Sequence, residues 1–119
     1  MNRTQTVGLL SELAFTKRCI ELGLEVLAPI GVERYDLVIV LGGEFQRVQV
    51  KTGLYRNGAI TFATSSNAEG VGRPRSYDGD ADLIGVYAQM SYGFNYFAST
   101  GNRRDEVTTM RLRSQEVQY

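Results

Sequence analysis

The chain has 119 residues, with 13 basic and 13 acidic side chains and no histidine. This length fits one domain spanning 1–119, and the balanced charge means that any contact with a polyanion must come from local clusters. The absence of histidine excludes Ser-His-Asp triads, Cys-His dyads and His-ligated zinc. A site built from carboxylates for a hard divalent cation stays open.

Cys19 is the single cysteine, so no internal disulfide can form, as is usual in a reducing compartment. No segment approaches the roughly 20 apolar residues of a membrane span. The N-terminus lacks the charged-then-apolar pattern of a signal peptide. We therefore expect a cytoplasmic protein that has no membrane segment.

The first predicted element is a helix over 6–22. Its apolar residues recur at helical spacing: Leu9, Leu10, Leu13, Ala14, Cys19 and Ile20. Thr4 or Thr6 is expected to cap its start, and Gly23 to end it. Glu12 has a mixed, partly apolar set of helical neighbours, so its carboxylate is expected to point toward the rest of the fold.

Strands dominate the remainder. A short strand at 24–28 stops before Pro29, and a β-hairpin joins 35–41 to 44–51 through Gly42-Gly43. The later elements expected are a turn at Asn57-Gly58, a strand at 59–64, a polar Gly-rich loop at 65–79, strands at 82–88 and 94–98, a helical turn at 103–106 and a strand at 109–113. The fold class is α/β, with one N-terminal helix.

The second strand of the hairpin has two different faces. Side chains alternate along a strand, so Val48 and Val50 are expected to face the core, while Gln49 and Lys51 share the other face. Lysine beside a polar neighbour near a strand end is suited to holding a phosphate or activating a water.

Asp36 lies near the start of the partner strand. If Leu41 pairs with Glu44 across the turn, the same register places Asp36 opposite Gln49, with Cβ atoms about 4.5–5.5 Å apart. Asp36, Gln49 and Lys51 then converge at one end of the hairpin. A carboxylate with amide or backbone oxygens can hold Mg²⁺ there, and the lysine can position the attacking water in phosphodiester hydrolysis.

The spacing of Glu12, Tyr35-Asp36 and Gln49-Val50-Lys51 resembles the PD-(D/E)xK nuclease superfamily. The resemblance covers 8–98 and is strongest over 34–64. There it is closest to the small intron-encoded homing endonucleases with a QxK motif and their phage and microbial relatives. The chain is also similar to Holliday junction resolvases.

This resemblance implies a restriction-endonuclease-like core, with the N-terminal helix packed on a central mixed sheet. It implies a metal-dependent DNA endonuclease that uses Mg²⁺, with Mn²⁺ as a substitute. The catalytic roles fall on Glu12, Asp36, Gln49 and Lys51, and the metal ligands on Glu12, Asp36 and the Val50 carbonyl. Two positions depart from the family pattern. Tyr35 stands in place of proline, and Gln49 replaces the usual acid, so Glu12 is expected to offset the missing carboxylate.

Duplex or branched DNA is the implied partner. We expect contacts from Arg56, Asn57, Arg73 and Arg75, which carry donors for phosphates and base edges. One chain holds one active site and cutting both strands needs two, so a homodimer or a dimer of dimers is expected. Two alternatives stay open: a Holliday junction resolvase, and a catalytically weak DNA-binding module.

Three other groups of residues have more than one interpretation. The aspartates at 78, 80 and 82 are spaced somewhat like a calcium loop, but a structural turn fits better, with Asp78 or Asp80 bordering the active site as the alternative. The late aromatic residues fit core packing or a subunit interface: Tyr87, Tyr92, Phe94, Tyr96 and Phe97. For the late arginines, contact with DNA and solvated surface charge are equally good interpretations: Arg103, Arg104, Arg111 and Arg113.

Overall fold

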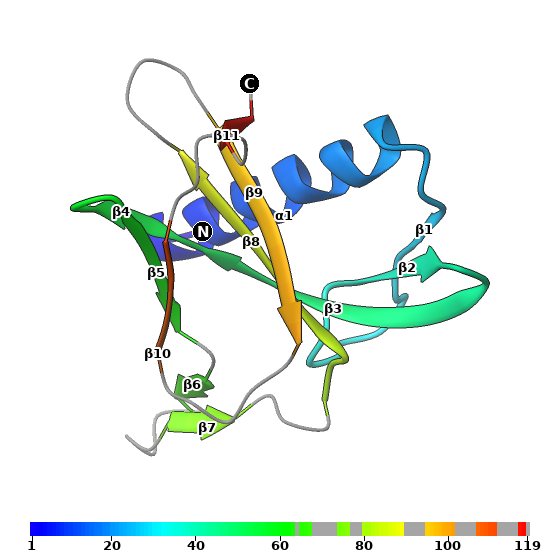
Figure 1. Ribbon diagram of the computed structural model, residues 1–119. Coiled ribbons are helices and arrows are strands. Elements are labelled where there is room, and N and C mark those ends of the chain that lie inside the picture. The colour runs from blue at the N-terminus through cyan, green and yellow to red at the C-terminus, as the bar shows by residue number, and fades with distance from the viewer. Residues whose placement is uncertain are drawn as a thin grey trace.

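The computed structural model describes residues 1–63, 65–67, 74–76, 80–89, 95–101, 107–111 and 117–118, with side chains placed at 1–62, 80–89 and 95–99. One helix and eleven strands follow in chain order within these residues (Figure 1). They are α1 (Arg3–Glu21), β1 (Val26–Leu27), β2 (Leu37–Leu41), β3 (Glu44–Thr52), β4 (Leu54–Arg56), β5 (Ala59–Ala63), β6 (Ser65–Asn67), β7 (Pro74–Ser76), β8 (Leu83–Gln89), β9 (Asn95–Gly101), β10 (Val107–Arg111) and β11 (Val117–Gln118).

Helix α1 starts earlier than its sequence pattern predicts. The Asn2 side chain accepts a hydrogen bond from the Gln5 backbone N–H (2.8 Å), and the Gln5 side chain accepts one from the Asn2 N–H (2.9 Å). This reciprocal capping box satisfies two donors that the helix itself leaves unpaired, so the predicted caps at Thr4 or Thr6 are wrong. Gly23 ends the helix as predicted, with φ of +81°.

The main sheet has six strands in the order β1-β2-β3-β8-β9-β11. All neighbours are antiparallel except β3 and β8, so the sheet is mixed, as predicted. Leu41 pairs with Glu44, which confirms the predicted register of the β2–β3 hairpin. Gly42 and Gly43 have φ of +57° and +82°, which glycine adopts without steric cost in a two-residue hairpin turn.

The connection from β3 to β8 crosses over the sheet and forms strands of its own. A parallel pair requires such a crossover. Here β4 and β5 join β10 in a three-stranded sheet, and β6 pairs with β7. The predicted single loop at 65–79 therefore contains a short two-stranded ladder, and the strands β4 and β11 have no counterpart in the sequence prediction.

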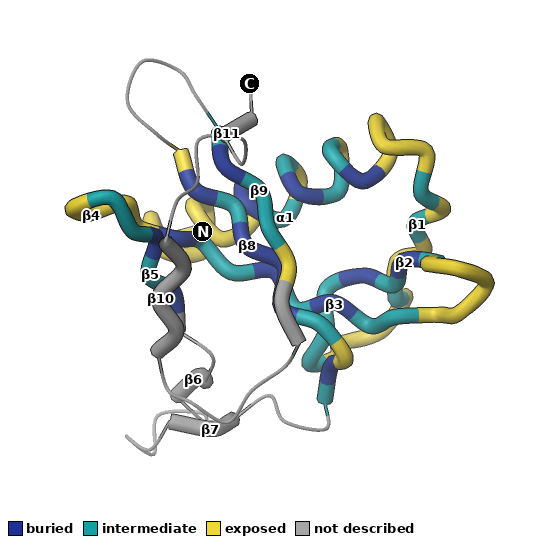
Figure 2. The backbone as a smooth tube through the Cα atoms, viewed as in Figure 1, coloured by how far each residue is buried: buried dark blue, intermediate teal, exposed yellow. Residues whose placement is uncertain are grey.

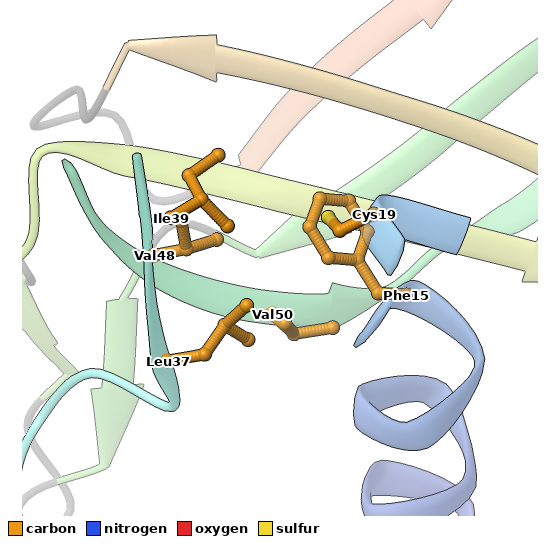
Figure 3. Packing of buried hydrophobic residues seen from close by; sticks show 6 residues of the cluster. All are labelled: Phe15, Cys19, Leu37, Ile39, Val48 and Val50. Atoms are coloured by element: carbon orange, nitrogen blue, oxygen red, sulfur yellow. The ribbon is translucent and has the colours of Figure 1, made fainter. Parts of the chain in front are cut away.

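Two hydrophobic clusters lie on opposite faces of the main sheet. On one face, α1 contributes Phe15 and Cys19, which pack on Leu37, Ile39, Val48 and Val50 (Figure 3). On the other face, Ile60 and Phe62 of β5 pack on Ile84, Val86, Ala88 and Tyr96. The central strand β8 is covered on both faces, which explains its continuous apolar sequence.

Gly85 makes the close approach of α1 to β8 possible. An added Cβ atom at this position would lie 2.5 Å from Cζ of Phe15, well inside contact distance. The Phe15 ring therefore occupies the space that a side chain on β8 would need. The sequence pattern did not predict this contact, because it depends on which two elements lie side by side.

The buried face of α1 differs from the predicted apolar face. Of the predicted set only Cys19 is buried, together with Ser11 and Phe15, whereas Leu10 and Leu13 are exposed. Ser11 tolerates burial because its hydroxyl hydrogen-bonds that of Thr52 on β3.

The late hairpin confirms core packing for its described aromatic residues. Tyr96 is fully buried, and the rings of Tyr87 and Phe97 lie 5.2 Å apart. Tyr92, Phe94 and the predicted helical turn at 103–106 lie outside the described residues. The predicted strand at 109–113 begins and ends two residues earlier, as β10.

No helix among the described residues is long and apolar enough to cross a membrane.

Candidate active site

Asp36 is fixed by two hydrogen bonds just before β2 begins. Its N–H donates to the carbonyl of Val48 (2.8 Å), which continues the β2–β3 ladder by one step. Its carboxylate Oδ2 accepts from the N–H of Val50 (2.8 Å). The side chain is therefore held against the edge of β3, and the confirmed register places Asp36 opposite Gln49, as predicted.

The Val50 carbonyl lies on the same side of β3 as Asp36. In an extended strand, the N–H and C=O of one residue point to the same neighbouring strand. Because the Val50 N–H is directed at the Asp36 carboxylate, the Val50 carbonyl is directed beyond the first residue of β2. The Asp36 carboxylate and the Val50 carbonyl thus face the same region, on the β2 side of β3.

Glu12 reaches this place from α1. Its carboxyl group lies close enough to that of Asp36 for each to influence the pKa of the other. Both residues line an open pocket of about 590 Å³ together with Gln49 and Val50. Met1 also lines the pocket, as do Gln5, Gly8 and Leu9 from the N-terminal half of α1. The structure therefore brings together Glu12, Asp36, Gln49 and Val50 from three separate elements.

The electrostatics of the two acids follow from their closeness and burial. Burial and the neighbouring Asp36 carboxylate raise the pKa of Glu12 above its usual range. Burial also raises the pKa of Asp36, although the Val50 N–H, the charge of Lys51 and the hydrogen bond from Glu12 oppose this rise. Two carboxylates forced together in this way favour binding of a proton or a cation.

Lys51 is close enough for its charge to act on Asp36. It is half-buried and shares the strand face of Gln49, while Val48 and Val50 are buried on the other face, as their alternation predicted. Lys51 is not part of the pocket wall. Its ammonium charge acts on Asp36, so it can also act on an anion bound there.

The donors at this site fit a hard divalent cation. They are two carboxylates, one amide oxygen and one backbone carbonyl, all oxygen ligands of the kind that Mg²⁺ accepts. Among the side chains that the structure describes, no cluster of three or more acids, cysteines or histidines exists. Gln49 lines the same pocket and carries an amide oxygen rather than a carboxylate.

The predicted DNA contacts lie away from the pocket wall or outside the described part of the chain. Arg56 and Asn57 are exposed at the tip of the β4–β5 hairpin, where Asn57 has φ of +51°. Arg73 is outside the described residues, and Arg75 is described only by its backbone in β7. The same holds for Arg111 in β10, while Arg103, Arg104 and Arg113 lie outside.

Asp80 and Asp82 lie in the turn and bend before β8, as a structural turn predicts, and both form ion pairs. Asp80 lies 3.3 Å from the guanidinium of Arg34. Asp82 accepts hydrogen bonds from the guanidinium and the backbone N–H of Arg47, and these hold the pKa of Asp82 below its usual range. Neither aspartate lines the pocket. Asp78 lies outside the described residues.

These ion pairs connect the segment before β8 to the two segments of the chain that carry Asp36 and Gln49. Arg34 precedes Asp36 by two residues, and Arg47 precedes Gln49 by two residues on the same strand face. Sequence reasoning missed both arginines, because only the tertiary pairing of β3 with β8 brings the aspartates to them. The Arg34–Asp80 pair ties the segment before β8 to the segment before β2 that carries Asp36, and the Arg47–Asp82 pair ties it to β3, which carries Gln49.

The model of one protein family, described as PD-(D/E)XK endonuclease, matches residues 2–119. The chain belongs to the PD-(D/E)XK endonucleases. Members of this family typically use divalent metal ions, in agreement with the oxygen donors around Asp36. A solved bacterial homing endonuclease, I-Ssp6803I, has the same fold as this PD-(D/E)XK chain. The TM-score is 0.70 at 20% identity, over 96% of this chain and 82% of that one.

Two curated relatives of this PD-(D/E)XK endonuclease differ in how much of each chain the similarity covers. Protein 5.3 of Escherichia phage T7 is 31% identical over 87 residues, which are 72% of this chain and 74% of that protein. The nitrate reductase alpha subunit of Mycobacterium tuberculosis is 60% identical over 37 residues, which are 31% of this chain. The chain spans only 3% of that subunit.

Proposed function

We propose that this endonuclease cleaves DNA with a divalent cation held by Glu12, Asp36 and the Val50 carbonyl. The observation that carries the proposal is the meeting of Glu12 and Asp36 in one pocket, beside the Val50 N–H that holds the Asp36 carboxylate and within reach of the Lys51 charge. Mg²⁺ is the expected ion, with Mn²⁺ as a substitute, because all the donors are oxygens. The ion would lower the pKa of a bound water and polarise the scissile phosphate.

Each residue has a separate role in this proposal. Glu12 and Asp36 supply the negative charge that holds the cation. Lys51 positions the attacking water and donates to a phosphate oxygen, where negative charge develops in the transition state. Gln49 contributes a neutral oxygen to the cation or orients the water, since its side chain lines the same pocket.

We favour a homing-type endonuclease, whose substrate is duplex DNA. The support is the QxK pattern at Gln49 to Lys51, together with a fold shared with a homing endonuclease over most of both chains. Cleavage of both strands of a duplex requires two sites, so the acting form is a homodimer or a dimer of dimers. The arginines at 56, 73 and 75, with Asn57, are the proposed DNA contacts.

The test is cleavage of supercoiled plasmid by purified protein, with Mg²⁺ or with a chelator. We expect cleavage only with the metal ion. Asp36→Asn and Lys51→Met should each reduce the rate by at least about a hundredfold, the scale of removing one charge-stabilising group. Glu44→Gln, which removes an exposed acid at the β2–β3 turn, is the matched control and should cleave normally. Equal rates for all three variants would overturn the assignment.

A catalytically weak DNA-binding module is the second candidate, and the neutral Gln49 favours it, because fewer carboxylates bind a cation more weakly. Gel-shift and cleavage assays across a metal titration separate the two. The module would bind DNA without divalent ions and never cut. Parallel assays on a four-way junction and on a linear duplex of the same sequence test the resolvase alternative, which predicts cleavage of the junction alone.

A further inference from the structure

Helix α1 meets the sheet along one line of three buried residues, Ser11, Phe15 and Cys19. They are four residues apart, so they share one face of the helix. Phe15 and Cys19 belong to an apolar cluster, and apolar packing sets the rotation of a helix less sharply than a hydrogen bond does. Ser11 makes the directional contact, because its hydroxyl hydrogen-bonds that of Thr52 at the end of β3.

Ser11 is also the last anchor of α1 toward its N-terminus. Residues 1–10 are all exposed, so the helix before Ser11 extends past the part that packs on the sheet (Figure 2). Without the Ser11 contact, Phe15 would be the first buried residue of the helix, and Glu12 would belong to the unsupported end. Short helical segments are marginal in water without packing, so such an end frays.

Thr52 is a rigid partner for this contact. It pairs with Tyr87 in the parallel β3–β8 ladder, and the next N–H, of Gly53, donates to the Tyr87 carbonyl (2.8 Å). An added Cβ atom at Gly53 would lie 2.5 Å from the Ile60 side chain, so the chain is tightly packed here. Branching at Cβ also restricts the rotamers of threonine. The Thr52 hydroxyl therefore has a well-defined position.

Both acids of the site are thus held to the same strand. Asp36 accepts a hydrogen bond from the Val50 N–H (2.8 Å). The helical turn that carries Glu12 is bonded to Thr52, two residues further along β3. Residues two apart on a strand are separated by roughly 7 Å, and Lys51 lies between these two points. The separation of Glu12 from Asp36 therefore depends on two hydrogen bonds to one short stretch of β3.

We propose that Ser11 and Thr52 are positioning residues of the nuclease site, which hold Glu12 at the distance from Asp36 that one divalent cation needs. The inference rests on the proposed function, in which these two acids hold the cation. A hydrogen bond is directional, so it fixes the rotation of α1 and its place along β3. Neither Ser11 nor Thr52 lines the pocket, so the pair acts through Glu12 and does not touch the cation.

Stability alone does not account for a serine at this position. Ser11 is 2% exposed. Alanine is a better helix former and needs no partner when it is buried. Apolar groups of the same shape can replace a buried hydrogen-bonded pair with little change in stability. The apolar pair lacks direction, however, and the placement of a metal ligand requires direction.

The test is binding of Mn²⁺ alone to the full chain, measured by calorimetry without DNA. Ser11→Ala and Thr52→Val should each weaken the affinity by about tenfold, the lower end of the range for residues that orient a metal ligand. Thr52→Ser keeps the hydroxyl and should bind as the wild type does. Tyr87→Phe is the matched control and should bind normally, because it removes another part-buried hydroxyl, the one bonded to Asn95 of β9.

A double-mutant cycle separates positioning from a structural role. If Ser11 acts through Glu12, adding Ser11→Ala to Glu12→Gln should change the Mn²⁺ affinity by less than about twofold. General loosening of the fold would weaken binding in both backgrounds. The double variant Ser11→Ala/Thr52→Val removes both hydroxyls, so urea unfolding should give nearly the wild-type midpoint while the affinity stays reduced. This variant keeps the proposal testable if a single substitution disturbs folding.

Cleavage of plasmid gives a second readout. About ten times more Mn²⁺ should restore cleavage by Ser11→Ala, but not by Lys51→Met, which keeps the metal ligands. Unchanged affinity in both Ser11→Ala and Thr52→Val, or an equal loss in the Glu12→Gln background, overturns this inference alone. A wild type that binds no Mn²⁺, or Glu12→Gln that binds it as tightly as the wild type, overturns the proposed function and this inference with it.

Discussion

The carboxyl groups of Glu12 and Asp36 share one pocket and influence each other's pKa, although one lies on α1 and the other just before β2. Both are partly withdrawn from water, and the pKa of each is raised. Each carboxyl group therefore keeps its proton up to a higher pH than an exposed carboxyl group does. Where the proton is still bound, a cation that binds between them displaces it.

The first prediction concerns metal affinity as a function of pH. Because both pKa values are raised, the affinity for Mg²⁺ or Mn²⁺ should keep increasing with pH above the range where exposed carboxylates are already ionised. Calorimetric titration in buffers of different ionisation enthalpy should detect release of protons on binding. Glu12→Gln should bind the ion more weakly and release fewer protons. An affinity that does not change from mildly acidic to mildly alkaline pH would contradict this interpretation of the pair.

The second prediction concerns stability without metal. The Glu12 pKa is raised in the folded protein above its ordinary value of 4.5, so folding favours the protonated form. Its contribution to stability is complete below the unfolded pKa and is lost as pH rises through the raised folded pKa. Glu12→Gln cannot lose a proton, so near neutral pH and with a chelator it should unfold at higher denaturant concentration than the wild type.

The measurement for Glu12→Gln is urea unfolding at several pH values. The advantage of the variant should shrink toward acidic pH, where the wild-type carboxyl group is protonated as well. Glu44→Gln is the control, because this acid is exposed at the β2–β3 turn. A difference in stability between wild type and Glu12→Gln that stays the same at every pH would refute the prediction. Activity should be reduced in the same variant, so stability and function change in opposite directions.

The third prediction concerns Gly85. Gly85→Ala places a methyl group 2.5 Å from the Phe15 ring, so α1 must shift and the variant should lose about 1–3 kcal/mol of unfolding free energy. Gly31→Ala is the control, since an added Cβ atom there meets nothing within 4 Å. Combining Gly85→Ala with Phe15→Leu should recover part of the loss in urea unfolding. Equal stability of the two alanine variants would show that α1 does not pack on β8 in this way.

The site was more predictable from the sequence than the packing around it. A two-residue glycine turn fixes the register of a hairpin, so the placement of Asp36 opposite Gln49 followed from local chemistry. The helical neighbours of Glu12 predicted only that its carboxylate points toward the rest of the fold. Its role beside Asp36 came through resemblance, because their meeting depends on how α1 lies on the sheet. The buried face of α1 was mispredicted for the same reason: Gly85 and Thr52 select Phe15 and Ser11 over more apolar neighbours.

The final prediction returns a carboxylate to the site. Gln49 lines the pocket with Glu12 and Asp36, so Gln49→Glu adds a third acid to the proposed ligand set. More ligand charge strengthens binding of a hard cation, and we expect the metal concentration for half-maximal binding to fall by about tenfold. Gln46→Glu makes the same chemical change on the opposite face of β3 and is the matched control. A metal titration in which both variants behave like the wild type would show that Gln49 does not face the cation.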